Sequence, residues 1–261
     1  MAKLTFAMVG RVALVTGAGQ GVGAEIARTL AAHGAHVAVN DFVIDRAETV
    51  VQDIQQAGGR ALAVQADVSD FSQVKMMAER IEHELGPPAV LVNNAGNAGP
   101  DEPMPRLDFW NTKPTEWDRY LRVNLHGVMV CTNVFIRQMI ASRWGRVLTI
   151  ISDAGRTGEQ GHEAYSAAKA GAAGFSRSLA RSAGQYGVTA NTISLGNIGR
   201  PDAESSTQSE ASISRMLKHY IIRRQGRPID VAAVALLLTS DAGEWITGQN
   251  FPVNGGFSLA L

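Results

Sequence analysis

Short apolar runs alternate with longer segments of helical periodicity along the whole chain, and this alternation restricts the fold more than any other feature. Most of the short runs are almost continuously apolar, as parallel strands are when helices cover both faces of a sheet. Strands are expected at 11–16, 36–40, 61–65, 89–93, 146–151, 188–193 and 249–253. Helices are expected at 21–33, 45–57, 70–85, 115–142, 163–186 and 229–240. The pattern predicts an α/β fold, a doubly wound parallel sheet of about seven strands with helices on both faces.

The length of 261 residues fits one such domain, and no linker, repeat or low-complexity tract divides it. We therefore expect residues 1–261 to form a single domain. Two stretches interrupt the alternation, a proline-rich one at 97–114 and a serine-rich one at 196–216. Each follows a strand, so each is expected at the carboxyl edge of the sheet, where ligands bind in doubly wound folds.

The charge pattern argues against several classes of partner. The 24 Lys and Arg balance the 24 Asp and Glu, and no basic run stands out, so neither a nucleic acid nor an anionic membrane is expected as a partner. No run of 18 apolar residues suggests a membrane span, and the first residues do not resemble a signal peptide, which predicts a cytoplasmic protein. The single cysteine, Cys131, is expected to be a buried thiol, and the histidines show no spacing typical of a metal site.

A glycine-rich stretch, TGAGQGVG at 16–23, directly follows the first expected strand and opens the first expected helix. In that position Gly17 allows a tight turn, Gly21 lets a pyrophosphate approach the backbone, and Gly23 lets the helix pack closely on the strand. The N-terminus of the helix, with Gln20 and Val22, offers unsatisfied N–H groups to phosphates. The sequence therefore predicts a dinucleotide site of the Rossmann type.

Acidic residues end the next two strands. Asp41 stands 24 residues after Gly17, where a carboxylate can accept both ribose hydroxyls and would repel a 2′-phosphate. Because no basic residue follows before Arg46, NAD is favoured over NADP as the cofactor. Asp67 and Val68 end the third strand; that carboxylate either faces the adenine amino group or caps the following helix.

Tyr165 and Lys169 are four positions apart within the Ala-rich segment EAYSAAKAG, so both side chains are expected on one face of a helix. A free tyrosine, with a pKa of about 10, is a poor base at neutral pH. A nearby ammonium favours the phenolate, so we expect Lys169 to lower the pKa of Tyr165 and make it a proton donor and acceptor. Ser152 follows the fifth strand and could hold the oxygen of a substrate by a hydrogen bond.

These motifs together resemble the classical short-chain dehydrogenase/reductase family over nearly the whole chain. The glycine motif, NNAG at 93–96, VNLHG at 123–127, Ser152, YSAAK at 165–169 and the closing ITGQNFPVNGG occur in the family's order. The resemblance implies a tetrad of Asn124, Ser152, Tyr165 and Lys169, in which Asn124 supports a water next to the lysine. It also implies cofactor contacts and a homotetramer. The implied cofactor contacts beyond the glycine motif and Asp41 are Asp67, Val68, Asn94, Ala95, Gly96, Tyr165, Lys169, Gly196 and Ile198.

The sequence departs from the family pattern after the sixth strand. Leu195 stands where proline is usual, and Ile198 and Gly199 stand near the usual hydroxyl residue, so a contact to the nicotinamide amide falls to the backbone of Ile198. SDAGR at 152–156 resembles the branch with hydroxyacyl-CoA dehydrogenases and acyl-carrier-protein ketoreductases, where Arg156 could meet an anionic carrier or form a surface salt bridge.

Three functions are compatible with these observations. The first is an NAD-dependent oxidoreductase that interconverts a secondary alcohol and a ketone. The second is an NADPH-dependent 3-oxoacyl thioester reductase, against which Asp41 argues. The third is a non-catalytic dinucleotide sensor on the same fold, against which the intact tetrad argues. The sequence leaves the substrate, its stereochemistry and the direction of the reaction open.

Overall fold

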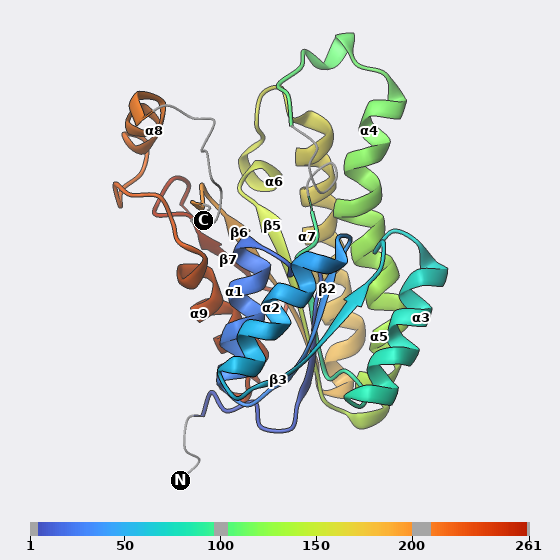
Figure 1. The fold of residues 1–261 in the computed structure, drawn as a ribbon. Helices are drawn as coiled ribbons and strands as arrows, with labels where there is room; N and C mark the ends of the chain where they lie inside the picture. The colour runs from blue at the N-terminus through green and yellow to red at the C-terminus, as the bar shows by residue number, and fades with distance from the viewer. Residues whose placement is uncertain (1–4, 97–103, 200–209, 260–261) are drawn as a thin grey trace.

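One parallel sheet forms the centre of the protein. The computed structural model describes residues 5–96, 104–199 and 210–259. In this part of the chain seven strands pair in the order β3-β2-β1-β4-β5-β6-β7 (Figure 1). The strands are β1 (Val12–Val15), β2 (His36–Asp41), β3 (Arg60–Gln65), β4 (Val90–Asn93), β5 (Gly145–Ser152), β6 (Val188–Leu195) and β7 (Asn250–Val253). The predicted seven-stranded doubly wound sheet is confirmed.

The strand order reverses next to β1, which pairs with β2 on one side and β4 on the other. The chain first winds outward to β3 and then returns across β1 to build the other half from β4 to β7. At such a reversal the loops after β1 and β4 part in opposite directions and leave a crevice at the carboxyl ends of the strands. The glycine-rich stretch and the NNAG motif both lie at this edge.

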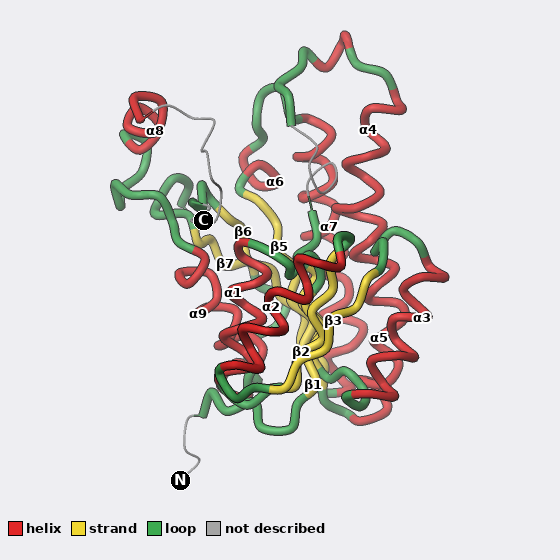
Figure 2. Tube along the Cα trace, viewed as in Figure 1, coloured by secondary structure: helices red, strands yellow, loops and turns green. Residues whose placement is uncertain are grey.

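Helices cover both faces of the sheet, and Figure 2 shows α1, α2 and α9 on one side with α3, α5 and α7 on the other. The bounds are α1 (Gly21–Ala32), α2 (Ile44–Gln56), α3 (Phe71–Glu84), α4 (Pro114–Leu121), α5 (Gly127–Ser142), α6 (Ala154–Thr157), α7 (Glu163–Ala183), α8 (Glu210–Leu217) and α9 (Pro228–Thr239). None of the described helices is long and apolar enough to cross a membrane.

Both faces of β1 are buried, which explains why this strand is apolar throughout. Ala13 and Val15 belong to the core beneath α1, α2 and α9, whereas Val12 and Leu14 belong to the core beneath α3 and α5. Cys131 lies in the second core and is buried, as predicted, and burial raises the pKa of its thiol to about 12.

The segment 115–142, predicted as one helix, is interrupted. Between α4 and α5 the turn Arg122–His126 is a π-helix, wound more widely than an α-helix. Two short helices were not predicted: α6 directly follows β5, and α8 lies within the stretch predicted as an irregular loop at 196–216. The fold is otherwise as expected, and Asp70 caps α3 by accepting hydrogen bonds from the N–H groups of Ser72 and Gln73.

Candidate active site

The loop between β1 and α1 is closely packed at two of its glycines and open beside a third. Gly17 and Gly21 both have positive φ angles, of 59° and 56°. A Cβ atom on Gly17 would lie 2.7 Å from the Cα of Ala95, and one on Gly23 would collide with the Asn94 amide. Beside Gly21, in contrast, no described atom lies within 4 Å of that position. Glycine is therefore needed at 17 and 23 for packing, while at 21 the surface is open to a ligand.

Thr16 and Asn94 fasten this loop to the end of β4. The Thr16 hydroxyl accepts hydrogen bonds from the N–H groups of Asn94 and Ala95, each at 3.1 Å. The Asn94 amide donates to the carbonyl oxygens of Thr16 and Gly17, each at 2.9 Å. The part played by Thr16 was not predicted from the sequence, although a hydroxyl at the end of a buried strand was the signal for it.

Asp41 is buried beside the glycine loop, with an exposed fraction of 6%. One carboxylate oxygen accepts the N–H of Gly19 at 2.9 Å, and the other accepts the N–H of Val43 at 3.0 Å. Each oxygen keeps further capacity to accept a hydrogen bond, so the carboxylate is held in place and can still accept hydroxyl groups from a ligand.

Asp67 is not the cap of α3; Asp70 has that position. Asp67 Oδ1 instead accepts bonds from the backbone N–H and the hydroxyl of Ser69, both at 2.8 Å. Its Oδ2 lies 3.9 Å from Nη2 of Arg122 on the π turn. Val68 is buried and would contact any side chain placed on Gly127. The third strand is thereby joined to the start of α5.

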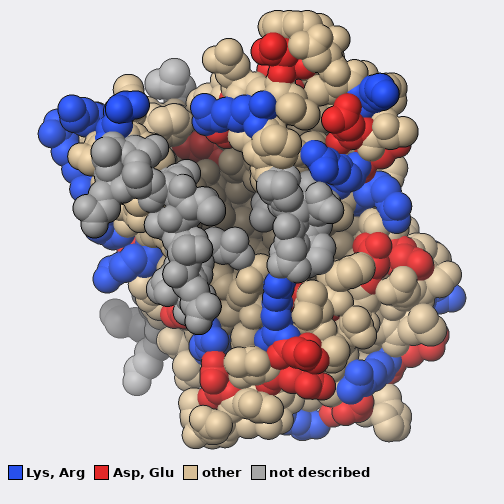
Figure 3. Space-filling view, turned by 45° about the horizontal axis from the view of Figure 1, so that its top comes forward, with Lys and Arg blue, Asp and Glu red and all other residues tan. Residues whose placement is uncertain are grey.

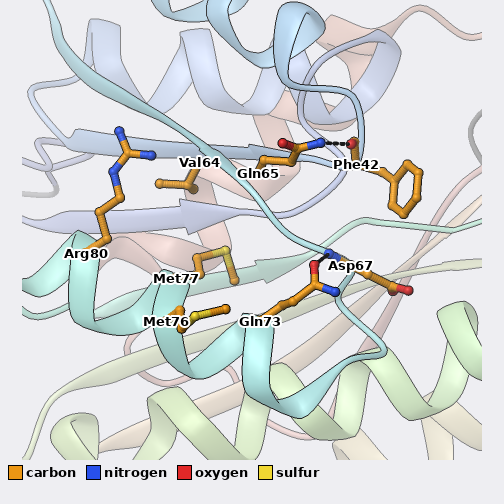
Figure 4. A pocket seen from close by; sticks show the side chains of 8 residues that line it. All are labelled: Phe42, Val64, Gln65, Asp67, Gln73, Met76, Met77 and Arg80. Carbon is orange, nitrogen blue, oxygen red and sulfur yellow. Dashed lines mark hydrogen bonds between the residues drawn. The ribbon is translucent and has the colours of Figure 1, made fainter.

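A cavity of about 470 Å³ opens beside the carboxyl end of β3. Figure 4 shows that the Gln65 amide, which donates to the carbonyl oxygen of Phe42 at 3.0 Å, forms part of its wall. The Asp67 side chain points away from the two methionines of α3 that also line it. The lining residues are Phe42, Val64, Gln65, Asp67, Gln73, Met76, Met77 and Arg80.

Lys169 and Asn124 are buried next to the NNAG motif. The ammonium of Lys169 donates to the carbonyl oxygen of Ile150 at 2.9 Å, and burial lowers its pKa to about 8. The Asn124 amide, in the π turn, donates to the carbonyl oxygen of Tyr120 at the end of α4 at 2.9 Å. A Cβ on Gly96 would lie 3.0 Å from Oδ1 of Asn124 and 3.3 Å from Nζ of Lys169. The glycine there lets both polar groups approach the end of β4.

Tyr165 lies beside Ser152, near Lys169. The Tyr165 ring lies 5.8 Å from Nζ of Lys169 and meets the Tyr120 ring edge-on at 6.4 Å. A hydrogen bond joins the phenol to the Ser152 side chain at the end of β5. The structure therefore brings Asn124, Ser152, Tyr165 and Lys169 together from a π turn, a strand end and one face of α7.

The pKa of Tyr165 does not follow the sequence-based expectation. Although part of the side chain is exposed, protein atoms surround the phenol, and burial raises its pKa to about 12. The hydrogen bond with Ser152 works in the opposite direction but is weaker, and Glu159 adds to the increase. The expected lowering by Lys169 is thus wrong for the protein's own groups, because desolvation of the phenolate is the largest influence on this pKa and only the Ser152 hydrogen bond lowers it.

The surface is hollowed at this carboxyl edge, and Figure 3 shows acidic and basic side chains interspersed around it. On the loop that precedes α4, Phe109 stacks on Trp117 with ring centroids 5.0 Å apart, whereas Trp110 is exposed. Among the described residues no group of three or more His, Cys, Asp or Glu is placed to hold a metal ion.

Comparison with known proteins agrees with this geometry. Residues 17–258 match the model of a protein family described as enoyl-(acyl carrier protein) reductase. A 3-oxoacyl-(acyl-carrier-protein) reductase of Staphylococcus aureus is 38% identical over 250 residues, which cover 95% of this chain and 98% of that protein. The chain belongs to the short-chain dehydrogenase/reductase family. It is an oxidoreductase of this family, and it carries the family's sequence motifs.

Other members of the short-chain dehydrogenase/reductase family act on different molecules. The 7alpha-hydroxysteroid dehydrogenase of Escherichia coli K12 is 36% identical over 248 residues, or 95% of this chain and 94% of that protein. A 7α-hydroxysteroid dehydrogenase structure, solved with NADH and 7-oxoglycochenodeoxycholic acid, has a TM-score of 0.89 and 33% identity, covering 98% of this chain and 97% of that one. Family membership alone therefore does not define the substrate.

Where this chain lacks the family's proline, hydrogen bonds hold the loop after β6. β6 continues to Leu195, which pairs with Ser152 and Val253. The Tyr220 hydroxyl accepts the N–H of Asn197 at 2.9 Å, and Ile198 forms a short parallel bridge with Gly226. A side chain on Gly196 would meet Asn254 at 2.9 Å. The role of Tyr220 was not predicted from the sequence.

Proposed function

We propose that this protein is an NAD-dependent oxidoreductase that interconverts a secondary alcohol and a ketone. The observation that carries the proposal is the convergence of Ser152, Tyr165 and Lys169 at the carboxyl edge, next to a glycine loop shaped for a pyrophosphate. The open position beside Gly21 and the free acceptor capacity of Asp41 fit a dinucleotide.

The residues proposed to hold the dinucleotide lie along the carboxyl edge. Gly17, Gln20, Gly21, Val22 and Gly23 would face the pyrophosphate, and Asp41 the adenosine ribose. Asp67 and Val68 would border the adenine; the NNAG residues Asn94, Ala95 and Gly96 would border the ribose and nicotinamide with Tyr165, Lys169, Gly196 and Ile198. When bound, the nicotinamide supplies the acceptor or donor of a hydride.

The protein's own groups perform the proton transfer. In alcohol oxidation the Ser152 hydroxyl donates a hydrogen bond to the substrate oxygen, and the Tyr165 phenolate takes the hydroxyl proton. In ketone reduction the neutral phenol gives that proton back. Lys169, fixed by the Ile150 carbonyl oxygen, places a positive charge near the phenolate when it forms, and Asn124 holds the π turn beside it. The pKa of Tyr165, about 12, favours the phenol as a proton donor at neutral pH.

The preference for NAD rests on Asp41. Its buried carboxylate is fixed by two backbone N–H groups, so it cannot turn away from a 2′-phosphate placed at the ribose. The negative charge at the position of the ribose hydroxyls therefore favours NAD.

The alternative is an NADPH-dependent reductase of 3-oxoacyl thioesters. The observation in its favour is the similarity, over nearly the whole chain, to the Staphylococcus aureus 3-oxoacyl-(acyl-carrier-protein) reductase. The two proposals differ in the cofactor, and the Asp41 carboxylate favours NAD over NADP.

Calorimetric titration with NAD and with NADP, combined with a spectrophotometric screen of secondary alcohols and hydroxyacyl thioesters, tests the proposal. We expect NAD to bind more tightly and the Asp41→Asn variant to lose that preference, while Asp53→Asn, which breaks a remote salt bridge with Arg28, keeps it. Tighter binding of NADP to the wild type would favour the thioester reductase instead.

Replacement of the phenol tests the chemistry separately from binding. Tyr165→Phe is expected to lower turnover by about 10²–10⁴-fold with unchanged affinity for the cofactor. Tyr186→Phe, in the turn after α7, is the matched control and should retain full activity. Turnover in the Tyr165→Phe variant at the wild-type rate would exclude this tyrosine as the proton donor. Cofactor binding without turnover of any substrate by the wild type would favour a sensor.

We further propose that the protein is cytoplasmic, as the sequence pattern predicts, and that it acts as a homotetramer, as the family resemblance implies. The described surface includes large exposed apolar side chains, among them Trp245 and Phe257 near the C-terminal strand, which a second copy could cover. Light scattering at micromolar concentration checks the assembly, and a monomer there would contradict it.

A further inference from the structure

The last described residues of the chain are bound to the turn that follows the catalytic strand β5. Asp153 is the residue after Ser152 and is 3% exposed, and Asn254, just after β7, is 7% exposed. Between them lies a network of polar contacts that the proposed chemistry does not use. It includes Arg156, which forms an ion pair with Asp153. Because that carboxylate is buried, the pair differs from the surface salt bridge that the sequence offered as one alternative.

The carboxylate of Asp153 is the centre of this network. Its Oδ2 accepts the Asn254 amide at 2.6 Å and the Ser258 hydroxyl at 2.9 Å. Its Oδ1 accepts Nη1 of Arg156 at 3.0 Å. Both oxygens are therefore engaged, and two of the three partners come from residues about a hundred positions further along the chain.

The guanidinium of Arg156 closes the network on the C-terminal side. Its Nη1 also contacts the Ser258 hydroxyl at 2.8 Å, and its Nη2 donates to the carbonyl oxygen of Leu259 at 3.0 Å. The Asn254 amide donates in addition to the carbonyl oxygen of Ser258 at 2.8 Å. A buried carboxylate is costly unless it is paired and fully hydrogen-bonded, so these contacts act as a unit.

Backbone hydrogen bonds of Asp153 connect the side-chain network to the turn that carries Ser152. Its N–H donates to the carbonyl oxygen of Leu195 on β6, and its carbonyl oxygen accepts the N–H groups of Arg156 and Thr157, at 2.8 and 2.9 Å. The Ser152 hydroxyl accepts the N–H of Ala154 at 3.2 Å. The short helix α6 therefore begins from Asp153 and holds the serine hydroxyl on its first turn.

We propose that Asp153 is a positioning residue through which the C-terminal segment 254–259 orients the Ser152 hydroxyl toward Tyr165. The inference rests on the proposed function, in which Ser152 holds the substrate oxygen. Loss of the carboxylate leaves the glycine loop and Asp41 intact, so it impairs the chemical step and not the binding of the cofactor.

Steady-state kinetics and cofactor binding of Asp153→Asn, Ser258→Ala and the double variant test the proposal. We expect kcat to fall about 10- to 100-fold in Asp153→Asn, because misplacement of a reacting group by about 1 Å can cost about 10²-fold, with an unchanged dissociation constant for NADH. Ser258→Ala should lower kcat less, and the double variant should be no slower than Asp153→Asn, because both substitutions break one network. Asp53→Asn and Ser182→Ala, which alter a remote carboxylate and a remote hydroxyl, should match the wild type.

A kcat equal to that of the wild type in Asp153→Asn overturns the proposal. A fall in both kcat and NADH affinity that matches the fraction of unfolded protein also overturns the proposal, because it indicates a purely structural role. Independent effects that multiply in the double variant contradict a single network.

Amide hydrogen exchange provides a readout that does not depend on the substrate. We expect exchange of the amides at 153–158 to accelerate in Ser258→Ala, although the substitution lies about a hundred residues away, and to stay unchanged in Ser182→Ala. Unchanged exchange in Ser258→Ala overturns the proposal. If the wild type turns over no alcohol or ketone, the proposed function fails, whereas accelerated exchange still establishes the link between the C-terminal segment and the Ser152 turn.

Discussion

Because the position beside Gly21 is open, the effect of a substitution there on nucleotide affinity can be measured separately from its effect on the stability of the fold. Gly21 and Gly58 both have positive φ angles, 56° and 84°, and at neither would a Cβ meet an atom within 4 Å. Alanine in this conformation costs about 1–2 kcal/mol, or about 2–8 °C in Tm for a domain of this size. Gly21→Ala and Gly58→Ala are therefore expected to lose the same stability.

Only one of the two alanines faces the proposed cofactor site. By calorimetric titration, Gly21→Ala should weaken NADH binding by at least about tenfold, because one lost close contact of about 1.4 kcal/mol has that effect. Gly58→Ala, at the end of α2, should bind NADH as the wild type does. Gly17→Ala should unfold at a lower temperature than either, since its Cβ would lie 2.7 Å from the backbone of Ala95.

Wild-type affinity in Gly21→Ala would refute the placement of the pyrophosphate at this loop. A larger stability loss in Gly21→Ala than in Gly58→Ala, measured by thermal unfolding without the cofactor, would refute the strain argument.

Three further predictions follow from single contacts. Burial lowers the pKa of Lys169 from 10.5 to about 8, so the cost of the buried ammonium is fully present below pH 8 and is relieved as the folded protein loses the proton. The free energy of unfolding of the wild type, relative to Lys169→Met, should therefore rise by about 3 kcal/mol between pH 8 and 10.5 in urea titrations, and a flat difference would contradict this. Asp70→Ala should destabilise the protein by about 0.5–2 kcal/mol through loss of the α3 cap, measured by the same titration, without affecting NADH binding. Tyr220→Phe leaves the N–H of Asn197 without its acceptor, which costs about 1–3 kcal/mol, so the affinity for NADH is expected to fall by about 5- to 150-fold. An unchanged affinity would show that this loop does not contact the cofactor.

The sheet was predictable because burial on both faces makes its strands apolar throughout, and the loops between them carry ordinary turn and cap signals. The interruption of 115–142 was not, because the apolar positions continue on both sides of the π turn and no proline or glycine marks the start of the wide turn. The helix α8 was missed because it spans only eight residues at the end of a long polar stretch, although Ile213, Met216 and Leu217 recur at helical spacing.

The candidate site was predictable as a set of residues but not in its energetics. The spacing of Tyr165 and Lys169 places both side chains on one face of α7, whereas the pKa of the phenol depends on the atoms that surround it, which sequence does not reveal. In the same way, the loop after Leu195, where the sequence departs from the family pattern, is held by Tyr220, a residue 25 positions further along the chain whose role no local pattern indicates.

The π turn at Arg122–His126 also fixes the phase between two halves of one long helix. An α-helix advances by about 100° per residue, so one extra residue in a turn rotates everything after it by that angle. With the turn in place, Tyr120 faces Tyr165 while Cys131 and Phe135 face the core. Deletion of a single residue here would turn one of these two faces away from its partner. This turn should therefore tolerate exchange of an exposed side chain such as His126 but no change in its length.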